Sequence, residues 1–453
     1  MSLIILPHHL YNKKIMNNTI HNNNINNIVL LEHPHYFTKY NYNKKKIMLH
    51  RASMKYYLDY LQYNIKPNHD HSINCKYVNF YDRKEIDALS NLTNIYIFDS
   101  IDKIDLPKHT KLESPNFLIN TNLIKEYRTK TDKFFFHYFY SVNKNKLNII
   151  PNIKSKDKYN RKPLNVKINI PKPFPSYNSN IRNKYIRGSI KYIKTYFNNN
   201  VGNVDHFNYP ITHKEALLVL KYFIKYKLTY FGPYQDAINN SENYLFHSLL
   251  SSSINIGLLN PDEIVRMILK YRNTIPINSL EGFIRQLFWR EYQRYCYIYY
   301  NFNNKNYFGN TKLLTTQWYT GQLNIKPVDD CIKKAFDTGY LHHIERLMIV
   351  GNYMNLSGIK PKEGFRWFME FSCDSYEWVM CQNVYDMVFY VSGGVTMRRP
   401  YISSSNYILN MSNYDRDDWT IIWNKKYQKF IKKHYDKLAF TGYYGIKNHK
   451  KSI

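Results

Sequence analysis

Two adjacent histidines, His342 and His343, stand in an apolar helical stretch and are followed by the charged residues Glu345 and Arg346. Adjacent residues on a helix point to different faces, so at most one of the two histidines can face a given cavity. A histidine that lines a pocket is a natural proton donor near neutral pH. The same pattern also fits surface or core histidines beside a Glu345–Arg346 ion pair.

Three further clusters carry polar side chains that suit a cofactor or a base. Phe231–Ala237 is a turn packed with hydrogen-bonding side chains, and His247–Ser251 places two hydroxyls and several amides near a turn, which suits a diphosphate. Gln286 and Arg290 are four residues apart on one predicted helix face, with Trp289 beside them. Taken singly, each cluster fits a loop, a cap or a salt-bridged helix equally well.

The elements that must position these clusters divide the chain into three parts. Residues 1–125 alternate short β-like runs with helical stretches, which predicts a Rossmann-like α/β domain with a parallel sheet. Residues 126–210 are rich in Asn, Lys and Pro and predict a connector with a few short helices. Residues 211–453 show apolar side chains at helical spacing, which predicts an all-α domain. The predicted strands are Leu3–Leu6, Asn27–Leu31, Lys76–Phe80 and Asn94–Phe98. The predicted helices are Lys46–Tyr63, Glu215–Leu228, Pro261–Tyr271, Leu280–Tyr300, Asp329–Leu356, Pro361–Cys373 and Trp423–Leu438.

The chain is strongly basic, with 64 Lys and Arg against 34 Asp and Glu and a formal net charge of +30. Such a charge attracts polyanions, although AT-rich coding also enriches Lys, Asn, Ile and Tyr. Five cysteines form no CxxC pair, which fits a reducing compartment. No apolar run approaches the ~20 residues of a membrane span, and the apolar start is too short for a signal peptide. We therefore expect a soluble intracellular protein without a membrane partner.

The order and spacing of the clusters closely resemble the photolyase/cryptochrome superfamily, in particular its branch of iron–sulfur bacterial cryptochromes and photolyases. The resemblance covers most of residues 114–440, whereas residues 1–110 match mainly in pattern. The matching stretches are YFGPYQDA (Tyr230–Ala237), LFHSLLSSSINIGLL (Leu245–Leu259), EGFIRQLFWREY (Glu281–Tyr292), TGYLHHIERLMIVGNYM (Thr338–Met354), NVYDM (Asn383–Met387) and RPYISSSNYI (Arg399–Ile408), with SPNFL (Ser114–Leu118), FFHYFY (Phe135–Tyr140) and KYNRKP (Lys158–Pro163) upstream.

The resemblance implies an FAD cofactor in the helical half. The residues that would line it are Tyr234, Ser248, Leu249, Leu250, Ser251, Arg290 and Asn383. Hydroxyls and amides suit the phosphates, a guanidinium suits their charge, and an amide side chain suits the flavin nitrogen. Trp367 matches an aromatic residue of the family's internal electron path, with Trp318 and Trp378 as further candidates, and Phe368 stands where many relatives have Tyr.

The resemblance also implies a substrate, which is UV-damaged DNA. In the similar 6-4 photolyases a histidine pair protonates the flipped photoproduct, so His342 and His343 are the candidate proton donors. Gln286 and Trp289 would contact the lesion, since a flipped base needs an aromatic wall and edge hydrogen bonds. We therefore expect a monomeric, FAD-dependent, blue-light-driven DNA photolyase of the 6-4 type. A cryptochrome-like photoreceptor without repair activity and a basic DNA-binding protein without flavin remain alternatives.

The chain departs from the resembling branch at three places. The first cluster cysteine aligns with Pro327, and the stretch after Tyr414 has no cysteines; Cys331 alone cannot hold a cubane, so no iron–sulfur cluster is expected. Pro7–Leu10 replaces the Gly-Asp-Gln-Leu turn that holds a lumazine antenna, although Glu32 is a candidate for the later antenna acid, so the sequence leaves the antenna open. The turn Val391-Ser392-Gly393-Gly394 replaces Ala-Asp-Gly-Gly, which removes one polar contact expected near the flavin.

Overall fold

The structure, a computed structural model, describes residues 1–65, 73–164, 168–177, 180–443 and 445–446. The chain forms two compact units, each assembled from segments that are separate in sequence. The first unit comprises Met1–Ile124, Phe174–Lys225 and Ser248–Ile268, and the second comprises Lys125–Pro173, Tyr226–His247 and Leu269–Ile453. The domain boundaries predicted at residues 125 and 210 stay predictions.

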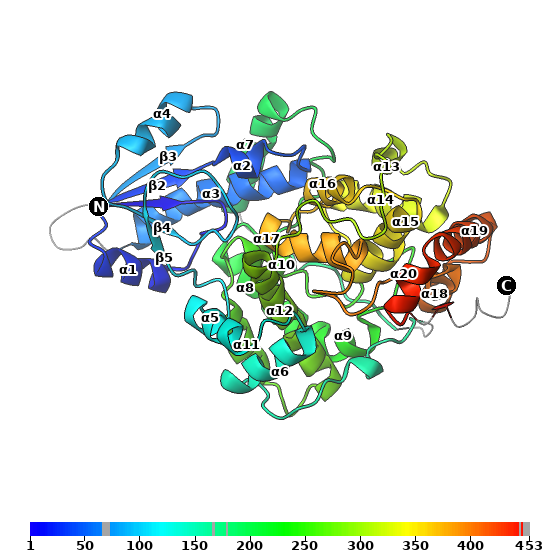
Figure 1. The fold of residues 1–453 in the computed structure, drawn as a ribbon. Coiled ribbons are helices and arrows are strands. Elements are labelled where there is room, and N and C mark those ends of the chain that lie inside the picture. The colour runs from blue at the N-terminus through cyan, green and yellow to red at the C-terminus, as the bar shows by residue number, and fades with distance from the viewer. Residues whose placement is uncertain (66–72, 165–167, 178–179, 444, 447–453) are drawn as a thin grey trace. The chain divides into compact units, whose positions relative to one another are not determined.

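A parallel five-stranded sheet in the order β3-β2-β1-β4-β5 forms the centre of the first unit (Figure 1). Its strands are β1 (Ser2–Ile5), β2 (Asn27–Leu31), β3 (Asn74–Val78), β4 (Ile95–Phe98) and β5 (Thr110–Leu112). In the register Ile4 pairs with Val29 on one side and with Ile97 on the other. The four predicted strands are confirmed to within two residues. The edge strand β5 was not predicted, because it has only three residues and these are largely exposed.

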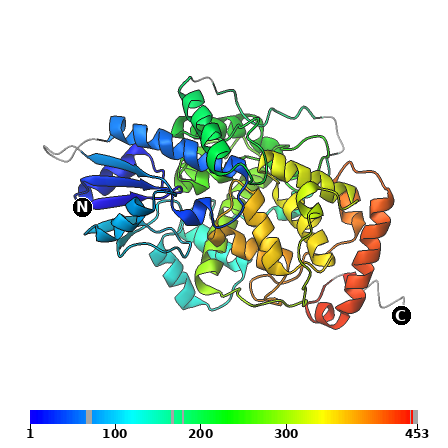
Figure 2. The same ribbon diagram turned by 90° about the horizontal axis from the view of Figure 1, so that it is seen from above.

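Helices cover the sheet because its central strands are apolar on both faces, as parallel strands usually are. The first unit contains α1 (Lys13–Asn22), α2 (Pro34–Phe37), α3 (Lys44–Asn64), α4 (Arg83–Ala88), η1 (Leu89–Asn91), α7 (Asn180–Tyr196), α8 (His213–Tyr226), α10 (Ser251–Asn255) and α11 (Pro261–Leu269), and α5 (Thr121–Lys130) begins in it. The long helix α3 lies along one side of the sheet and packs against α7 (Figure 2). Its N-cap is Asn43, whose side chain accepts the Lys45 N–H.

Helix α7 corrects the prediction that the connector holds only short helices, since it has 17 residues. Its buried side chains, including Tyr185, Tyr192 and Ile193, recur at helical spacing. The surrounding Lys, Arg and Asn conceal this apolar stripe in a composition-based reading.

Among its described residues, the second unit consists of helices joined by loops, with one isolated β-bridge between Lys312 and Ile359. Its elements are α6 (Phe136–Lys146), η2 (Asp157–Tyr159), α9 (Leu228–Tyr234), α12 (Ile277–Tyr299), α13 (Gln317–Thr320), α14 (Lys326–Thr338), η3 (Glu345–Gly351), α15 (Asn352–Leu356), α16 (Pro361–Phe371), α17 (Glu377–Cys381), η4 (Gln382–Val388), α18 (Ser405–Met411), α19 (Asp418–Lys433) and α20 (Tyr435–Phe440). The helix starts predicted at Pro261 and Pro361 are both confirmed. The single helical stretch predicted over Asp329–Leu356 is wrong, because α14 ends at Gly339, whose φ of 69° caps it in the left-handed region.

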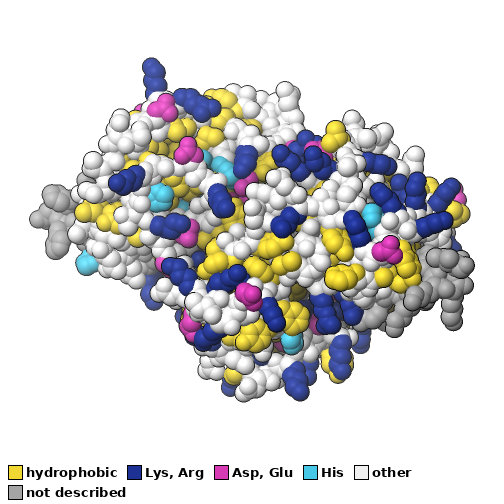
Figure 3. All heavy atoms as spheres, viewed as in Figure 1, with side chains coloured by type: hydrophobic (Ala, Val, Ile, Leu, Met, Phe, Trp, Pro, Cys, Tyr) yellow, Lys and Arg dark blue, Asp and Glu magenta, His cyan; other side chains and the backbone are white. Residues whose placement is uncertain are grey.

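The surface is basic and also carries apolar side chains. On the face drawn in Figure 3, Lys and Arg side chains are widely distributed, with hydrophobic side chains between them. Among the described residues, no helix combines the length and the apolar character that crossing a membrane requires.

Candidate functional site

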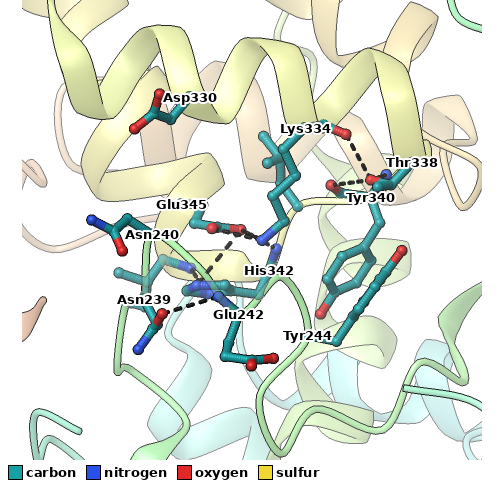
Figure 4. Close-up of polar contacts among 12 residues, drawn as sticks. Asn239, Asn240, Glu242, Tyr244, Asp330, Lys334, Thr338, Tyr340, His342 and Glu345 are labelled. Atoms are coloured by element: carbon teal, nitrogen blue, oxygen red, sulfur yellow. Dashed lines mark hydrogen bonds and ion pairs between the residues drawn. The ribbon is translucent and has the colours of Figure 1, made fainter. Parts of the chain in front are cut away.

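The histidine pair lies in the short segment that follows the cap of α14. The Thr338 hydroxyl accepts the Tyr340 N–H at 3.1 Å, and the Glu345 carboxylate accepts the His342 N–H at 3.1 Å. These two bonds fold the chain back from α14 into the π-helical turn η3 (Figure 4). The break that sequence periodicity missed is thus the feature that positions both histidines.

His342 is buried, with 3% of its surface exposed. Its ring stacks on that of His247, with a centroid distance of 4.7 Å and an interplanar angle of 15°. Its Nδ1 accepts the Ile344 N–H at 3.3 Å, and its Nε2, 3.6 Å from the Glu345 carboxylate, has no hydrogen-bond partner among the described residues. Burial above all, and then the neighbouring His247, keeps the pKa of His342 well below its usual value, so the ring is neutral near pH 7.

His343 is the more accessible of the two histidines. Its side chain is 41% exposed, and its Nε2 lies 3.0 Å from the Asp236 carboxylate. The two rings differ in exposure, but each offers a ligand atom within 4.8 Å of the other and of His247, so the expectation that only one of them can face a given cavity is not confirmed. A carboxylate on one ring nitrogen fixes the tautomer and the orientation of the other.

A buried ion pair lies beside His342. Lys334 of α14 donates to both Glu345 oxygens at 2.7 and 2.8 Å, with side chains that are 8% and 4% exposed (Figure 4). Arg346 instead makes a forked contact with Asp374 at 3.1 Å. The Glu345–Arg346 ion pair of the alternative, purely structural reading does not form, because each side chain meets a partner from a different element. An open groove of about 590 Å³ adjoins this pair and is lined by Asn240, Asn243, Lys326, Asp330, Lys333, Lys334 and Asp337.

Two further members of this site, His247 and Asp236, stand in clusters that the sequence analysis singled out, but it assigned neither of them to the histidine pair. The nitrogens of the buried His247 ring lie 3.2 Å from the Tyr244 carbonyl and 3.0 Å from the Gln235 carbonyl. Burial lowers the pKa of His247 to about 3, helped by the nearby His343. A neutral ring can donate to only one carbonyl. Both residues stand inside stretches that resemble the family, which is the signal that could have found them.

Helix α12 carries the predicted lesion contacts and one predicted flavin contact. Gln286 and Trp289 are half-buried, and the Trp289 ring stacks on Phe136 with a centroid distance of 3.6 Å. The Arg290 side chain is 10% exposed and lies over the Trp378 ring at 4.8 Å. The stack leaves only one ring face of Trp289 for a base.

Asn383 and its neighbours form a second polar group in this unit. The Asn383 side chain donates to the Val379 carbonyl at 2.8 Å, and the adjacent Gln382 is fully buried. Neither amide atom of Gln382 has a hydrogen-bond partner in the part of the chain that the structure describes. Buried amides without partners are rare in proteins and indicate a missing ligand or water. This orphaned amide fits a polar cofactor next to Asn383, and sequence reasoning had not singled it out.

The turn that departs from the family is stabilised internally. Ser392 donates its backbone N–H to Asp386 at 2.8 Å and its hydroxyl at 2.5 Å, and the Thr396 hydroxyl donates to the same carboxylate. Burial raises the pKa of Asp386, whereas these bonds oppose the rise. A carboxylate is therefore present at this turn, supplied from the helical segment η4 instead of from the turn itself.

The residues Ser248–Ser251 belong to the first unit, whereas Tyr234, Arg290 and Asn383 belong to the second. Ser248 and Ser251 are half-buried, and Leu249 and Leu250 are buried, with Leu249 at a φ of 58°. The next hydroxyls, Ser252 and Ser253, are buried and have no hydrogen-bond partner within the described residues. These unsatisfied hydroxyls fit a ligand with many acceptors, such as a diphosphate. Tyr234 ends α9, and its ring packs 5.7 Å from Phe246.

The predicted electron-path residue Trp367 is fully buried. Its indole N–H donates to the Trp318 carbonyl at 2.7 Å, and its ring lies 5.6 Å from Phe336 and 4.8 Å from Phe371. Trp318 and Trp378 are also buried. These contacts are ordinary aromatic packing, so the electron-transfer role stays a prediction.

Glu32, the candidate antenna acid, is fully buried in the first unit and already saturated. Arg51, Tyr77 and Tyr192 each donate to its carboxylate at 2.6 Å, and the Phe80 N–H donates at 3.2 Å. A carboxylate offers about four lone-pair sites, and these four donors fill them. Glu32 therefore does not fit a role in holding an antenna chromophore.

The positions that the resemblance assigns to an iron–sulfur cluster do not offer thiolates. Pro327 stands in the first turn of α14, and Cys331 is buried one turn later. The Tyr414 hydroxyl donates to the Asp330 carboxylate at 3.1 Å, which closes this corner with an aromatic ring. These side chains do not fit a cubane cluster.

A parallel α/β sheet in one unit and a helical second unit match the architecture that the photolyase/cryptochrome resemblance implies. A model of the family described as deoxyribodipyrimidine photo-lyase-related protein matches residues 3–209. The similarity to the photolyase/cryptochrome superfamily that the sequence predicts is confirmed over these matched parts of the chain, and the α/β-plus-helical fold class predicted from sequence is confirmed.

Individual relatives support this placement. A (6-4) photolyase of Agrobacterium fabrum is 36% identical over 236 residues, which are 51% of this chain and 46% of the relative, so the match spans about half of that enzyme. The crystal structure of a class III photolyase of Agrobacterium tumefaciens is similar with a TM-score of 0.51 at 14% identity, covering 97% of this chain and 92% of the other. A Synechocystis cryptochrome is similar with a TM-score of 0.59 at 13% identity, covering 95% and 87%. At such identities the two structures establish the fold alone.

Proposed function

We propose that this protein is an FAD-dependent, blue-light-driven DNA photolyase that repairs 6-4 pyrimidine photoproducts. The proposal is supported by the similarity to the superfamily and by the partial match to a (6-4) photolyase. The observation that carries it is the arrangement of the histidine pair, in which one ring is accessible and held by a carboxylate while the other is buried.

His343 is the proton donor in this proposal. Its ring is half-exposed, so a flipped base can reach it, and Asp236 at 3.0 Å orients it. His342 is buried and neutral, so it acts as a positioning residue that stacks on His247 and anchors the turn. The proton would pass from the free ring nitrogen of His343 to the photoproduct.

Polar residues of the second unit would hold the FAD. Arg290 offers a guanidinium that is mostly buried, and Asn383 and Gln382 offer amides. When bound, the flavin supplies the light-excited electron donor. The side chains of this chain bind it, orient it and exclude water.

Damaged DNA would be held first by charge. The net charge of +30 favours a polyanion, and neutralised phosphates make such binding strongly salt-dependent. The free face of Trp289 offers a stacking surface for a flipped base, and Gln286 on the same helix offers an amide for its edge.

The test is a repair assay on the full-length purified protein. We expect a flavin absorption spectrum and blue-light repair of an oligonucleotide that carries a 6-4 photoproduct. His343→Ala should lower repair by about 10²–10⁴-fold, the usual contribution of general acid–base catalysis, with flavin content unchanged. The matched control is His137→Ala, an exposed histidine of the same unit, which should repair normally.

Three results would contradict parts of this proposal. A colourless preparation refutes the FAD assignment. Flavin without any light-dependent repair favours the cryptochrome-like photoreceptor. Normal repair by His343→Ala removes His343 from the mechanism, even if the enzyme is a photolyase.

A further inference from the structure

Three imidazole rings of the second unit converge on one point. His247, His342 and His343 each offer one ligand atom, and these atoms lie within 4.8 Å of one another. They come from two segments about a hundred residues apart in sequence, so their convergence is a product of the fold. We propose that these three histidines bind one divalent transition-metal ion, with Zn²⁺ as the representative ion.

Acceptors for the non-binding ring nitrogens are already in place. Metal-bound histidines usually donate their other N–H to a carboxylate or carbonyl, which fixes the ring. Asp236 lies 3.0 Å from Nε2 of His343, and the Gln235 carbonyl lies 3.0 Å from Nε2 of His247. In the tautomer that these acceptors favour, Nδ1 carries the lone pair that a metal uses, and Nδ1 of His247 has to turn away from the Tyr244 carbonyl, 3.2 Å away, to reach the ion.

His342 follows the same pattern more loosely. Its Nε2 lies 3.6 Å from the Glu345 carboxylate, and its Nδ1 holds only a long contact of 3.3 Å to the Ile344 N–H. A metal would replace this weak backbone bond and draw the Nε2–H toward Glu345. The Lys334 ammonium is compensated by Glu345 at 2.7 Å, so it adds no uncompensated positive charge beside a cation.

The site has to contract slightly to bind. Zn–N bonds of about 2.0–2.1 Å in a tetrahedral site bring the nitrogens to about 3.4 Å from one another. The present spacing of up to 4.8 Å therefore requires ring movements of roughly 1 Å. His343 can make most of this movement, because its side chain is 41% exposed and is not packed into the core.

The ligand set selects the class of metal. Three nitrogens without a thiolate suit Zn²⁺, Cu²⁺, Ni²⁺ and Co²⁺, whereas Mg²⁺ and Ca²⁺ prefer oxygen ligands. Three protein ligands leave a fourth position for water. The accessible edge of the site at His343 provides the entry path for the ion.

Metal binding would act on the proposed repair reaction as a switch. A metal on His343 occupies the lone pair through which this residue exchanges its proton, so Zn²⁺ should inhibit repair and a chelator should restore it. This consequence rests on the proposed function, but the metal site itself does not. Zn²⁺ binding is therefore measured in the dark and without DNA.

The experiment is equilibrium dialysis of the full-length protein against ZnCl₂, with MgCl₂ as the counter-probe. We expect one saturable equivalent of Zn²⁺ per chain and no competition from Mg²⁺. His343→Ala should weaken binding by at least 10-fold, and Asp236→Asn should weaken it by about 10–100-fold, as removal of a ligand's hydrogen-bond acceptor does. His137→Ala should bind Zn²⁺ as the unmodified protein does.

Electron paramagnetic resonance of the Cu²⁺ form provides a second readout that does not depend on affinity. We expect hyperfine splitting from three nitrogens in the unmodified protein and from two in His343→Ala. Saturable Zn²⁺ binding that is unchanged in both His343→Ala and His342→Gln overturns the site, as does an absence of saturable binding. Zn²⁺ binding without any effect on repair upholds the site and refutes the switch.

Discussion

The buried ion pair beside the histidines allows a quantitative test of how this site is built. Glu345 and Lys334 are 4% and 8% exposed and share two hydrogen bonds of 2.7 and 2.8 Å. Replacement of Glu345 by Gln leaves an ammonium group in a nearly dry site without its counter-charge. Loss of one partner from such a pair costs about 3–5 kcal/mol. Deprotonating an ordinary lysine at pH 7 costs about 4–5 kcal/mol, which is no less than the cost of leaving the ammonium group without its counter-charge.

The assay is urea unfolding followed by tryptophan fluorescence. All six tryptophans lie in the second unit, so their emission reports the unfolding of the unit that contains the pair. They are Trp289, Trp318, Trp367, Trp378, Trp419 and Trp423. We expect Glu345→Gln to lower the free energy of unfolding by about 3–5 kcal/mol, which appears as a lower midpoint at an unchanged slope.

Two matched variants separate the charge effect from a general loss of packing. Lys326 pairs with Asp330 on the same helix, but there the side chains are 57% and 33% exposed. Lys326→Met should therefore change stability by about 1 kcal/mol at most. The double variant Lys334→Met, Glu345→Leu removes both charges and should recover most of the loss. The reasoning is refuted if Glu345→Gln costs no more than Lys326→Met, or if the double variant is as unstable as the single one.

Two further predictions concern protons and packing. Burial lowers the pKa of His213 to about 4, so on acidification this histidine takes up a proton in the unfolded chain before it does so in the folded one. The free energy of unfolding should therefore fall by up to about 3 kcal/mol between pH 6.5 and 4. His213→Gln should reduce this pH dependence, which is measured by unfolding followed by circular dichroism. Gly364→Ala would place a methyl group 2.3 Å from the buried Phe389 ring and should lower the free energy of unfolding by about 1–3 kcal/mol, measured by tryptophan fluorescence. Gly188→Ala, in α7, meets open space and should raise the free energy of unfolding by about 0.5–1 kcal/mol, measured by circular dichroism.

Local sequence patterns were sufficient for the elements that are regular over their whole length. The apolar run that forms β1 and the amphipathic pattern of α3 are both read correctly, because burial repeats with the period of the backbone. Gly339 shows where this fails, since one left-handed residue ends a helix inside an apolar pattern that continues beyond it. Helix α7 fails in the other direction: a regular helix is present, but the many Lys and Asn residues around its apolar stripe conceal it.

The candidate site was predictable only in part, because its polar partners are distant in sequence. The motif identified His342 and His343 as candidate residues, but not that both rings lie close to His247. Asp236, however, lies 107 residues before His343, and no local periodicity connects them. The same holds for His247, whose ring stacks on His342 only after the chain has folded. Long-range convergence of this kind decides the surroundings of each histidine, and it is not encoded in either segment alone.

A match between positions also differs from a match in chemistry. Glu32 occupies the place of an antenna acid, but its oxygens are filled by Arg51, Tyr77, Tyr192 and a backbone amide. Glutamate is therefore a suitable residue type at this position, but the lone pairs of Glu32 already accept hydrogen bonds from the protein. Asp386 shows the reverse, since a carboxylate missing from the turn is supplied from a neighbouring helical segment. A side chain can bind a ligand only through its own donor and acceptor atoms that have no hydrogen-bond partner. Among the described residues, Gln382 and His342 have such buried atoms, whereas the oxygens of Glu32 are already hydrogen-bonded.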